Sequence, residues 1–174
     1  MEIANGVPRV IFQGRIMTVR ADPVLAKSGP GTREVVDRPP AAAVVAQTAD
    51  GRVVVIRQFR WAVQRTLVEL PAGLIDPGET PLAAAQRELR EETGYLADHW
   101  QLAFDCYTSP GFSTERIHVF YASRLSAGDT HTDPDEEIAV ECWDRARIEN
   151  CLKNPSEANG ILVSGLLWWL ANYG

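Results

Sequence analysis

Three glutamates near the middle of the chain have a spacing that suits metal chemistry: Glu88, Glu91 and Glu92. On an α-helix, residues three and four apart are neighbours, so these carboxylates would lie on one face and repel one another. Hard oxygen ligands in such a cluster suit Mg²⁺ or Mn²⁺, with water and phosphate oxygens completing the shell. The alternative is a solvated face on which Arg87 and Arg90 pair with the glutamates. We interpret the cluster as a divalent-metal site.

The segment that carries these glutamates has the start and stop signals of a helix. Thr80 can cap its first turn by accepting a hydrogen bond from an unpaired amide, and Pro81 suits the first helical position. Nearly all the following residues are strong helix formers, and Gly94 can adopt the left-handed conformation that ends a helix. The sequence therefore predicts a helix that begins at Pro81 and ends before Gly94.

Taken whole, the stretch from Gly73 to Tyr95 resembles the Nudix box, the signature of hydrolases that act on nucleoside diphosphates linked to another moiety. That pattern is glycine, five residues, glutamate, seven residues, Arg-Glu, an aliphatic residue, any residue, Glu-Glu, any residue, glycine and an aliphatic residue. It is filled in register by Gly73, Glu79, Arg87, Glu88, Leu89, Glu91, Glu92 and Gly94. Only Tyr95 departs from it, at the last aliphatic position.

The resemblance implies roles for the residues of the box. A bound cation neutralises a pyrophosphate and lowers the pKa of an attacking water, so the metal ligands are also the expected catalytic residues. Glu79 is expected to support the ligands or a water, and Arg87 to orient carboxylates. The expected ligands are the backbone carbonyl of Ala72 and the carboxylates of Glu88, Glu91 and Glu92, with Glu91 binding or bridging a second ion.

Upstream of the box, Arg57-Gln-Phe-Arg60 and Glu69-Leu-Pro-Ala-Gly73 resemble the segment found in the ADP-ribose pyrophosphatase branch of this family. In that branch an arginine matching Arg60 holds the pyrophosphate, and a guanidinium fork suits phosphate oxygens. The resemblance implies that Arg57, Arg60 and Glu69 bind substrate. Without it, the arginines would be interpreted as ordinary surface residues.

Two segments downstream of the box also match that branch. Pro110 follows Tyr95 by 15 residues in a Ser-Pro-Gly turn, which marks the substrate class and implies a substrate-binding role for Pro110 and Gly111. The structural alternative is a plain turn between strands. In the acidic run before Ile138, Glu136 matches a loop glutamate that handles the attacking water. Glu137 stays open as that catalytic glutamate, and the run could instead be a solvated loop.

Composition and charge limit the other possibilities. The chain has 174 residues with 45% hydrophobic residues, enough for one sizeable core, and a net charge of -6 that argues against nonspecific nucleic-acid binding. The three cysteines have no paired spacing, so a reducing cytoplasm is the default location. We expect no membrane role, because the longest apolar run, Ile161 to Ala171, is too short to span a bilayer.

The remaining pattern predicts an α+β protein. We expect a mixed β-sheet sandwiched between the box helix and the C-terminal helix, with a small N-terminal antiparallel sheet attached. The expected division is an N-terminal β subdomain over residues 1–38 and a Nudix hydrolase domain over 39–174. The turn cluster Lys27–Thr32 is predicted to join two N-terminal strands. The other predicted strands are 41–47, 52–58, 100–107, 117–125 and one ending near Trp143; the predicted helices are 145–154 and 156–172.

The resemblance also implies a reaction and an assembly. The expected reaction is hydrolysis of ADP-ribose to AMP and ribose 5-phosphate. The alternatives are hydrolysis of another nucleoside diphosphate sugar such as GDP-mannose, or a ligand sensor without catalysis, for which a degraded box would be expected. Because this family commonly exchanges its N-terminal part between subunits, a homodimer is implied.

Overall fold

The computed structural model describes residues 1–128 and 137–174. It divides into two compact units: residues 1–40 with 106–117, and residues 41–105 with 118–174. Strands β9 and β10 contain residues of both units. Each unit is described by itself.

The first unit is built on an antiparallel sheet with the order β1-β3-β2, in which β4 also pairs with β3. The pairing of β3 with β4 continues to Ala26 and Gly29, so only Lys27 and Ser28 form the turn. The predicted turn over Lys27–Thr32 was therefore wrong in its last four residues, which belong to β4. Pro30 donates no hydrogen bond, and proline within sheets is confined mainly to edge strands or strand starts, such as the start of β4. The strands are β1 (Ile3–Ala4), β2 (Arg9–Gln13), β3 (Thr18–Ala26) and β4 (Gly29–Asp37).

The second unit holds a seven-stranded mixed sheet with the order β11-β6-β5-β10-β9, to which β7 adds beside β6 and β8 beside β5. The predicted α+β class is confirmed. Its strands are β5 (Ala41–Gln47), β6 (Val53–Arg60), β7 (Arg65–Glu69), β8 (Ala72–Leu74), β9 (Tyr95–Tyr107), β10 (Arg116–Ala127) and β11 (Ile138–Trp143). Its helices are α1 (Pro81–Thr93), α2 (Arg145–Lys153) and α3 (Gly160–Tyr173).

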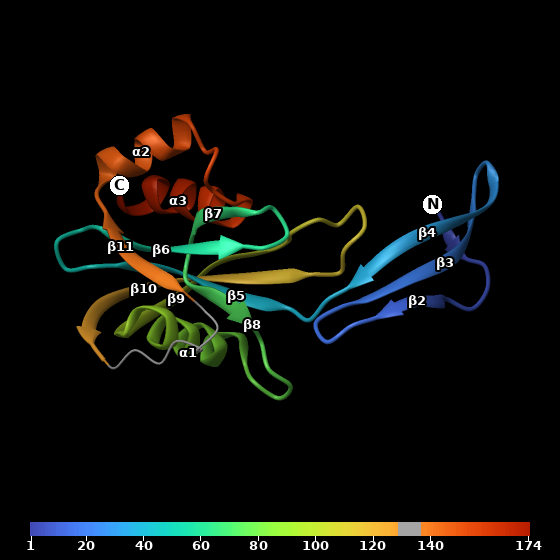
Figure 1. The fold of residues 1–174 in the computed structure, drawn as a ribbon, viewed down its shortest axis with the longest axis horizontal. Coiled ribbons are helices and arrows are strands. Elements are labelled where there is room, and N and C mark those ends of the chain that lie inside the picture. The colour runs from blue at the N-terminus through green and yellow to red at the C-terminus, as the bar shows by residue number, and fades with distance from the viewer. Residues whose placement is uncertain (129–136) are drawn as a thin grey trace. The chain divides into compact units, whose positions relative to one another are not determined.

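Helices cover both faces of this sheet, with α1 on one side and α2 and α3 on the other (Figure 1). On the first side, Val44 and Val54 belong to one buried cluster with Ala85 and Leu89 of α1. On the second side, Gly165 lets α3 approach closely, because a Cβ there would lie 2.7 Å from Leu70 Cδ1. The sandwich places α1 and its acidic residues on one defined face.

The C-terminal helix begins at Gly160 and not at Ser156 as predicted. Asn159 caps it, since its Oδ1 accepts from the Leu162 amide at 2.8 Å. The predicted strand Ala41–Gln47 recurs with the same ends and the other predicted strands with shifted ends. Strands β7 and β8 were not predicted, because five and three residues give little periodic signal. No helix in the described ranges is long and apolar enough to cross a membrane.

Candidate active site

Helix α1 forms as its local signals predict. The Thr80 Oγ1 accepts from the Ala83 amide at 3.2 Å, and Pro81 occupies the first turn. Gly94 ends the helix with φ 71°, and its amide donates to the Arg90 carbonyl at 2.8 Å. Because both ends of α1 are fixed, the residues of α1 that face the sheet are fixed too.

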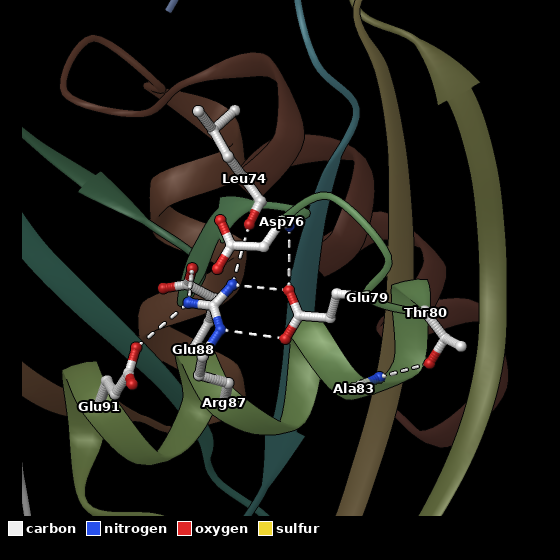
Figure 2. A network of polar contacts seen from close by, with 8 residues as sticks. All are labelled: Leu74, Asp76, Glu79, Thr80, Ala83, Arg87, Glu88 and Glu91. Atoms are coloured by element: carbon white, nitrogen blue, oxygen red, sulfur yellow. Dashed lines mark hydrogen bonds and ion pairs between the residues drawn. The ribbon is translucent and has the colours of Figure 1, made fainter.

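The guanidinium of Arg87 lies at the centre of a network of carboxylates (Figure 2). Its Nη1 donates to Glu88 Oε1 at 2.6 Å and to Glu91 Oε2 at 3.2 Å. Its Nε and Nη2 donate to the two oxygens of Glu79 at 3.1 and 3.0 Å, and Nη2 also donates to the Leu74 carbonyl at 2.9 Å. One guanidinium thus binds the loop before α1 to two glutamates of the helix.

Charge pairing shifts the pKa values of this network. The hydrogen bond from Arg87 lowers the pKa of Glu79 below its ordinary value, and the Asp76 amide, which donates to Glu79 Oε2 at 3.1 Å, adds to the effect. The pKa of Arg87 rises well above its ordinary value, chiefly through the bond to Glu79 and against the opposing effect of burial. Glu79 and Arg87 therefore stay ionised at neutral pH.

Two positions of the preceding strand, Ala72 and Gly73, lie against the box glutamates Glu92 and Glu88. A Cβ at Gly73 would lie 1.9 Å from Glu88 Oε1, so only glycine leaves room for this carboxylate. The amide of Ala72 donates to Glu92 Oε2 at 2.9 Å, and Glu92 is 5% exposed. Arg87 does pair with Glu88 and Glu91, as the alternative interpretation expects, whereas Glu92 is buried and not solvated.

The carboxylate oxygens of this site are the kind of ligand that a hard divalent cation prefers. Among Arg87, Glu79, Glu88 and Glu91 there are three carboxylates for one guanidinium, so the group keeps a net negative charge. Over the described ranges, no three acidic, histidine or cysteine side chains are gathered closely enough to hold an ion as they stand. The Ala72 carbonyl was the expected ligand, and the contact observed at Ala72 is made by its amide.

Arg60 and Glu69, both predicted to bind substrate, form an ion pair with each other. The Arg60 Nε and Nη2 donate to the two Glu69 oxygens at 2.9 and 2.7 Å, and Glu69 is 5% exposed. Val54 packs in the α1 cluster, and alternate residues of a strand share a face, so Arg60 also lies on the α1 side.

The structure does not bring Arg57 to the same place. Three positions from Arg60 on β6, it faces the α2 and α3 side, where its Nε donates to Glu141 Oε1 at 2.9 Å. Its Nη1 donates to Glu157 Oε2 at 3.2 Å. The sequence named both arginines without the strand register that separates them.

The downstream residues are described each in its own part of the chain. Pro110 and Gly111 are exposed in a turn of the first unit, closed by the Ser113 amide, which donates to the Ser109 carbonyl at 2.8 Å. Glu137 is exposed immediately before β11. Glu136 lies outside the described residues.

A backbone contributor was missed by sequence reasoning. The Leu74 carbonyl accepts from Arg87, and a backbone contact of this kind leaves no signal in the side-chain pattern. Gln58 is 6% exposed on the same strand as Arg60.

Comparison with known proteins places this arrangement in a family. A NUDIX domain model matches residues 37–158. A Bacillus subtilis strain 168 protein named ADP-ribose pyrophosphatase is 40% identical over 144 residues, covering 82% of this chain and 77% of the relative. A Mycobacterium tuberculosis protein of the same name is 45% identical over 161 residues, covering 90% and 78%.

The fold has a solved counterpart. A crystal structure titled ADP compounds hydrolase superposes with a TM-score of 0.85 at 24% identity, covering 97% of this chain and 94% of the other. That likeness concerns the fold, while the domain match and the two relatives concern the sequence as well. The domain match and the two relatives show that this chain belongs to the Nudix family.

Proposed function

We propose that the protein hydrolyses the pyrophosphate bond of ADP-ribose to AMP and ribose 5-phosphate with a divalent metal ion. One observation carries this proposal: the box carboxylates on α1 and the Arg60–Glu69 pair lie on the same face of the sheet. A cation site and a phosphate-binding guanidinium on one face are what pyrophosphate hydrolysis needs. The two relatives named ADP-ribose pyrophosphatase support the choice of substrate.

The chain's own residues have separable tasks in this reaction. Glu88, Glu91 and Glu92, with the Ala72 carbonyl, are the proposed ligands of Mg²⁺, or of Mn²⁺ in its place. When bound, that cation neutralises phosphate oxygens and lowers the pKa of the attacking water. Arg87 fixes the carboxylates before substrate arrives, since it bonds two of them and the loop at once.

Arg60 is the proposed binder of the pyrophosphate. Glu69 accepts from its Nε and one Nη, which orients the guanidinium. Charge-assisted bonds to phosphate oxygens then position the substrate and stabilise charge as it shifts in the transition state. Glu136, or Glu137 in its place, is the proposed glutamate that takes the proton of the attacking water.

The domain division, the assembly and the location of the protein are proposed as well. We place the hydrolase domain at 39–174 and the dimer-forming part at 1–38, with Pro110 and Gly111 near the substrate. A homodimer is supported by β2, whose Val10, Ile11 and Phe12 are each more than half exposed. We also propose a cytoplasmic location without nucleic-acid or membrane partners, which the composition supports.

A second candidate substrate is GDP-mannose, by the same metal chemistry. A Cronobacter sakazakii protein named GDP-mannose pyrophosphatase is 41% identical over 118 residues, a shorter match of 62% of this chain. The third possibility, a sensor without catalysis, lacks support because every acidic position of the box is filled.

The test is a product assay on the purified chain with ADP-ribose, GDP-mannose and dinucleotides in Mg²⁺ or Mn²⁺. We expect AMP and ribose 5-phosphate from ADP-ribose at the highest kcat/KM, and no turnover after chelation. Glu92→Gln should lower turnover by roughly a hundredfold or more, since several kcal/mol of charge stabilisation depend on the metal. A higher kcat/KM for GDP-mannose would favour the second candidate, and metal-independent turnover would contradict the mechanism.

A further inference from the structure

Gln58 is a buried side chain with an unsatisfied oxygen. It is 6% exposed, and its Oε1 has no hydrogen-bond partner in the described part of the chain. Most buried polar atoms are paired, and an unpaired one costs stability. A free-energy cost kept beside a candidate active site needs an explanation in function.

The strand register places Gln58 on the catalytic face. It lies opposite Leu67 of β7 and Ile138 of β11, and two residues before Arg60 on β6. Because side chains alternate along a strand, Gln58 and Arg60 share the face that α1 covers, and Arg57 lies on the other. The amide is therefore on the same side as the box.

The Arg60–Glu69 ion pair brings the phosphate-binding group to Gln58. In the pairing of β6 with β7, Arg60 lies opposite Arg65, whereas Glu69 lies opposite Ile56. To reach Glu69, the Arg60 side chain must run back along the strand across the position of Gln58, about 6.6 Å away at two residues of strand. The joined guanidinium and carboxylate thus lie beside the Gln58 amide.

Gln58 Oε1 accepts from no donor in the described part of the chain, the Arg60 guanidinium included, and neither neighbouring anion can supply a donor. A carboxylate and an ionised pyrophosphate only accept hydrogen bonds. In a nucleoside diphosphate sugar, the donors next to the pyrophosphate are the hydroxyls of the flanking sugars. We propose that Gln58 is a substrate-binding residue whose Oε1 accepts a hydrogen bond from a sugar hydroxyl beside the pyrophosphate held by Arg60. This inference rests on the proposed function.

The test compares two ligands that differ in sugar hydroxyls. Calorimetry measures binding of α,β-methylene ADP-ribose, which resists hydrolysis, and of inorganic pyrophosphate, both with Mg²⁺. In Gln58→Met we expect roughly tenfold weaker binding of the ADP-ribose analogue, the size of one lost hydrogen bond, with pyrophosphate binding within about twofold of the parent. Arg60→Ala should weaken both ligands. Gln86→Met, on the exposed side of α1, is the matched control and should change neither.

Thermal unfolding without ligand supplies an independent readout. Methionine removes the unsatisfied oxygen at similar volume, so the Gln58→Met midpoint should equal or exceed that of the parent, and Gln58→Leu should behave alike. Equal weakening of both ligands, no change in either, or a clear fall in the midpoint of both variants would overturn the assignment. A parent protein that binds pyrophosphate but not the ADP-ribose analogue would instead contradict the proposed function.

Discussion

The two faces of the central sheet each carry a cluster of arginine and glutamate side chains, and the clusters differ in charge balance. The Arg87 cluster, on the α1 side, joins one guanidinium to Glu79, Glu88 and Glu91. The carboxylates outnumber the guanidinium, so they repel one another in part. The cluster therefore carries a net negative charge.

The Arg57 cluster, on the α2 and α3 side, is balanced. Arg57 pairs with Glu141 and Glu157, and Arg147 also bonds Glu141 while stacking 4.7 Å from the centre of the Trp143 ring. Two guanidiniums meet two carboxylates, and they join β6 and β11 to α2 and the segment before α3. A cluster with balanced charges can stabilise a fold, whereas a cluster with a net negative charge is suited to bind a cation.

The largest effect on this comparison is expected from Gly73→Ala, which disturbs the Arg87 cluster without removing a charge. The new Cβ would lie 1.9 Å from Glu88 Oε1 and 2.2 Å from its carboxyl carbon, so this carboxylate must move. A displacement of about 1 Å in a catalytic group can cost roughly a hundredfold in rate. We expect a loss of kcat of that size, measured with ADP-ribose and saturating Mg²⁺.

Gly160→Ala is the matched control for this substitution, at the start of α3. A Cβ there meets nothing within 4 Å, so activity should be unchanged and the unfolding temperature equal or slightly higher. Full activity in Gly73→Ala would show that the position of Glu88 in this structure is not the catalytic one.

The parts predicted from sequence are those with local signals. Thr80, Pro81 and Gly94 specify the ends of α1 by their own backbone chemistry, and the box spacing gathers its glutamates on one helix face. The extent of the Lys27–Thr32 turn was wrong because tertiary pairing with β3 draws Gly29 into a strand. Local composition cannot report such a partner.

The parts that sequence could not provide depend on register and close packing. Arg57 and Arg60 differ by three positions, so a strand sends them to opposite faces, but their residue types are identical. Likewise, the close contact of Gly73 with Glu88 joins residues on β8 and α1. These relations decide which arginine can join the site, and they exist only in the folded chain.

The two arginines of β6 give the next prediction, with a moderate effect. Arg60→Ala should raise KM and lower kcat/KM by roughly ten- to a hundredfold, because a charged hydrogen bond contributes about 1.5–3 kcal/mol. Arg57→Ala should leave kcat/KM within about twofold and lower the free energy of unfolding by about 1 kcal/mol, as expected for a partly exposed ion pair. Steady-state kinetics and urea unfolding of both variants measure this.

The same pair of variants can contradict the comparison. If Arg57→Ala loses as much kcat/KM as Arg60→Ala, the Arg57 cluster reaches the substrate and the separation of the two faces fails. If Arg60→Ala binds ADP-ribose as tightly as the parent, its bond to Glu69 is structural.

The smallest expected effect concerns acid stability, since each cluster contains one carboxyl with a lowered pKa. In the Arg87 cluster, the bond from Arg87 lowers the pKa of Glu79 below its ordinary value of 4.5. In the Arg57 cluster, burial raises the pKa of Glu141, but the Trp143 hydrogen bond and the charges of Arg147 and Arg57 outweigh it and lower the pKa overall.

A lowered folded-state pKa means that the unfolded chain binds more protons in acid. The stabilisation from Glu79 and Glu141 is therefore complete above their ordinary pKa and is lost as pH falls through the folded value. Glu79→Gln and Glu141→Gln should each flatten the fall in unfolding free energy between about pH 5 and 3, because glutamine does not titrate. Urea unfolding across this pH range measures the slopes.

Since the clusters lie on opposite faces, the two changes should add within about 0.5 kcal/mol in the double variant. A larger departure from additivity would mean that the two clusters are coupled through the sheet, and that charge balance on one face is set partly by the other.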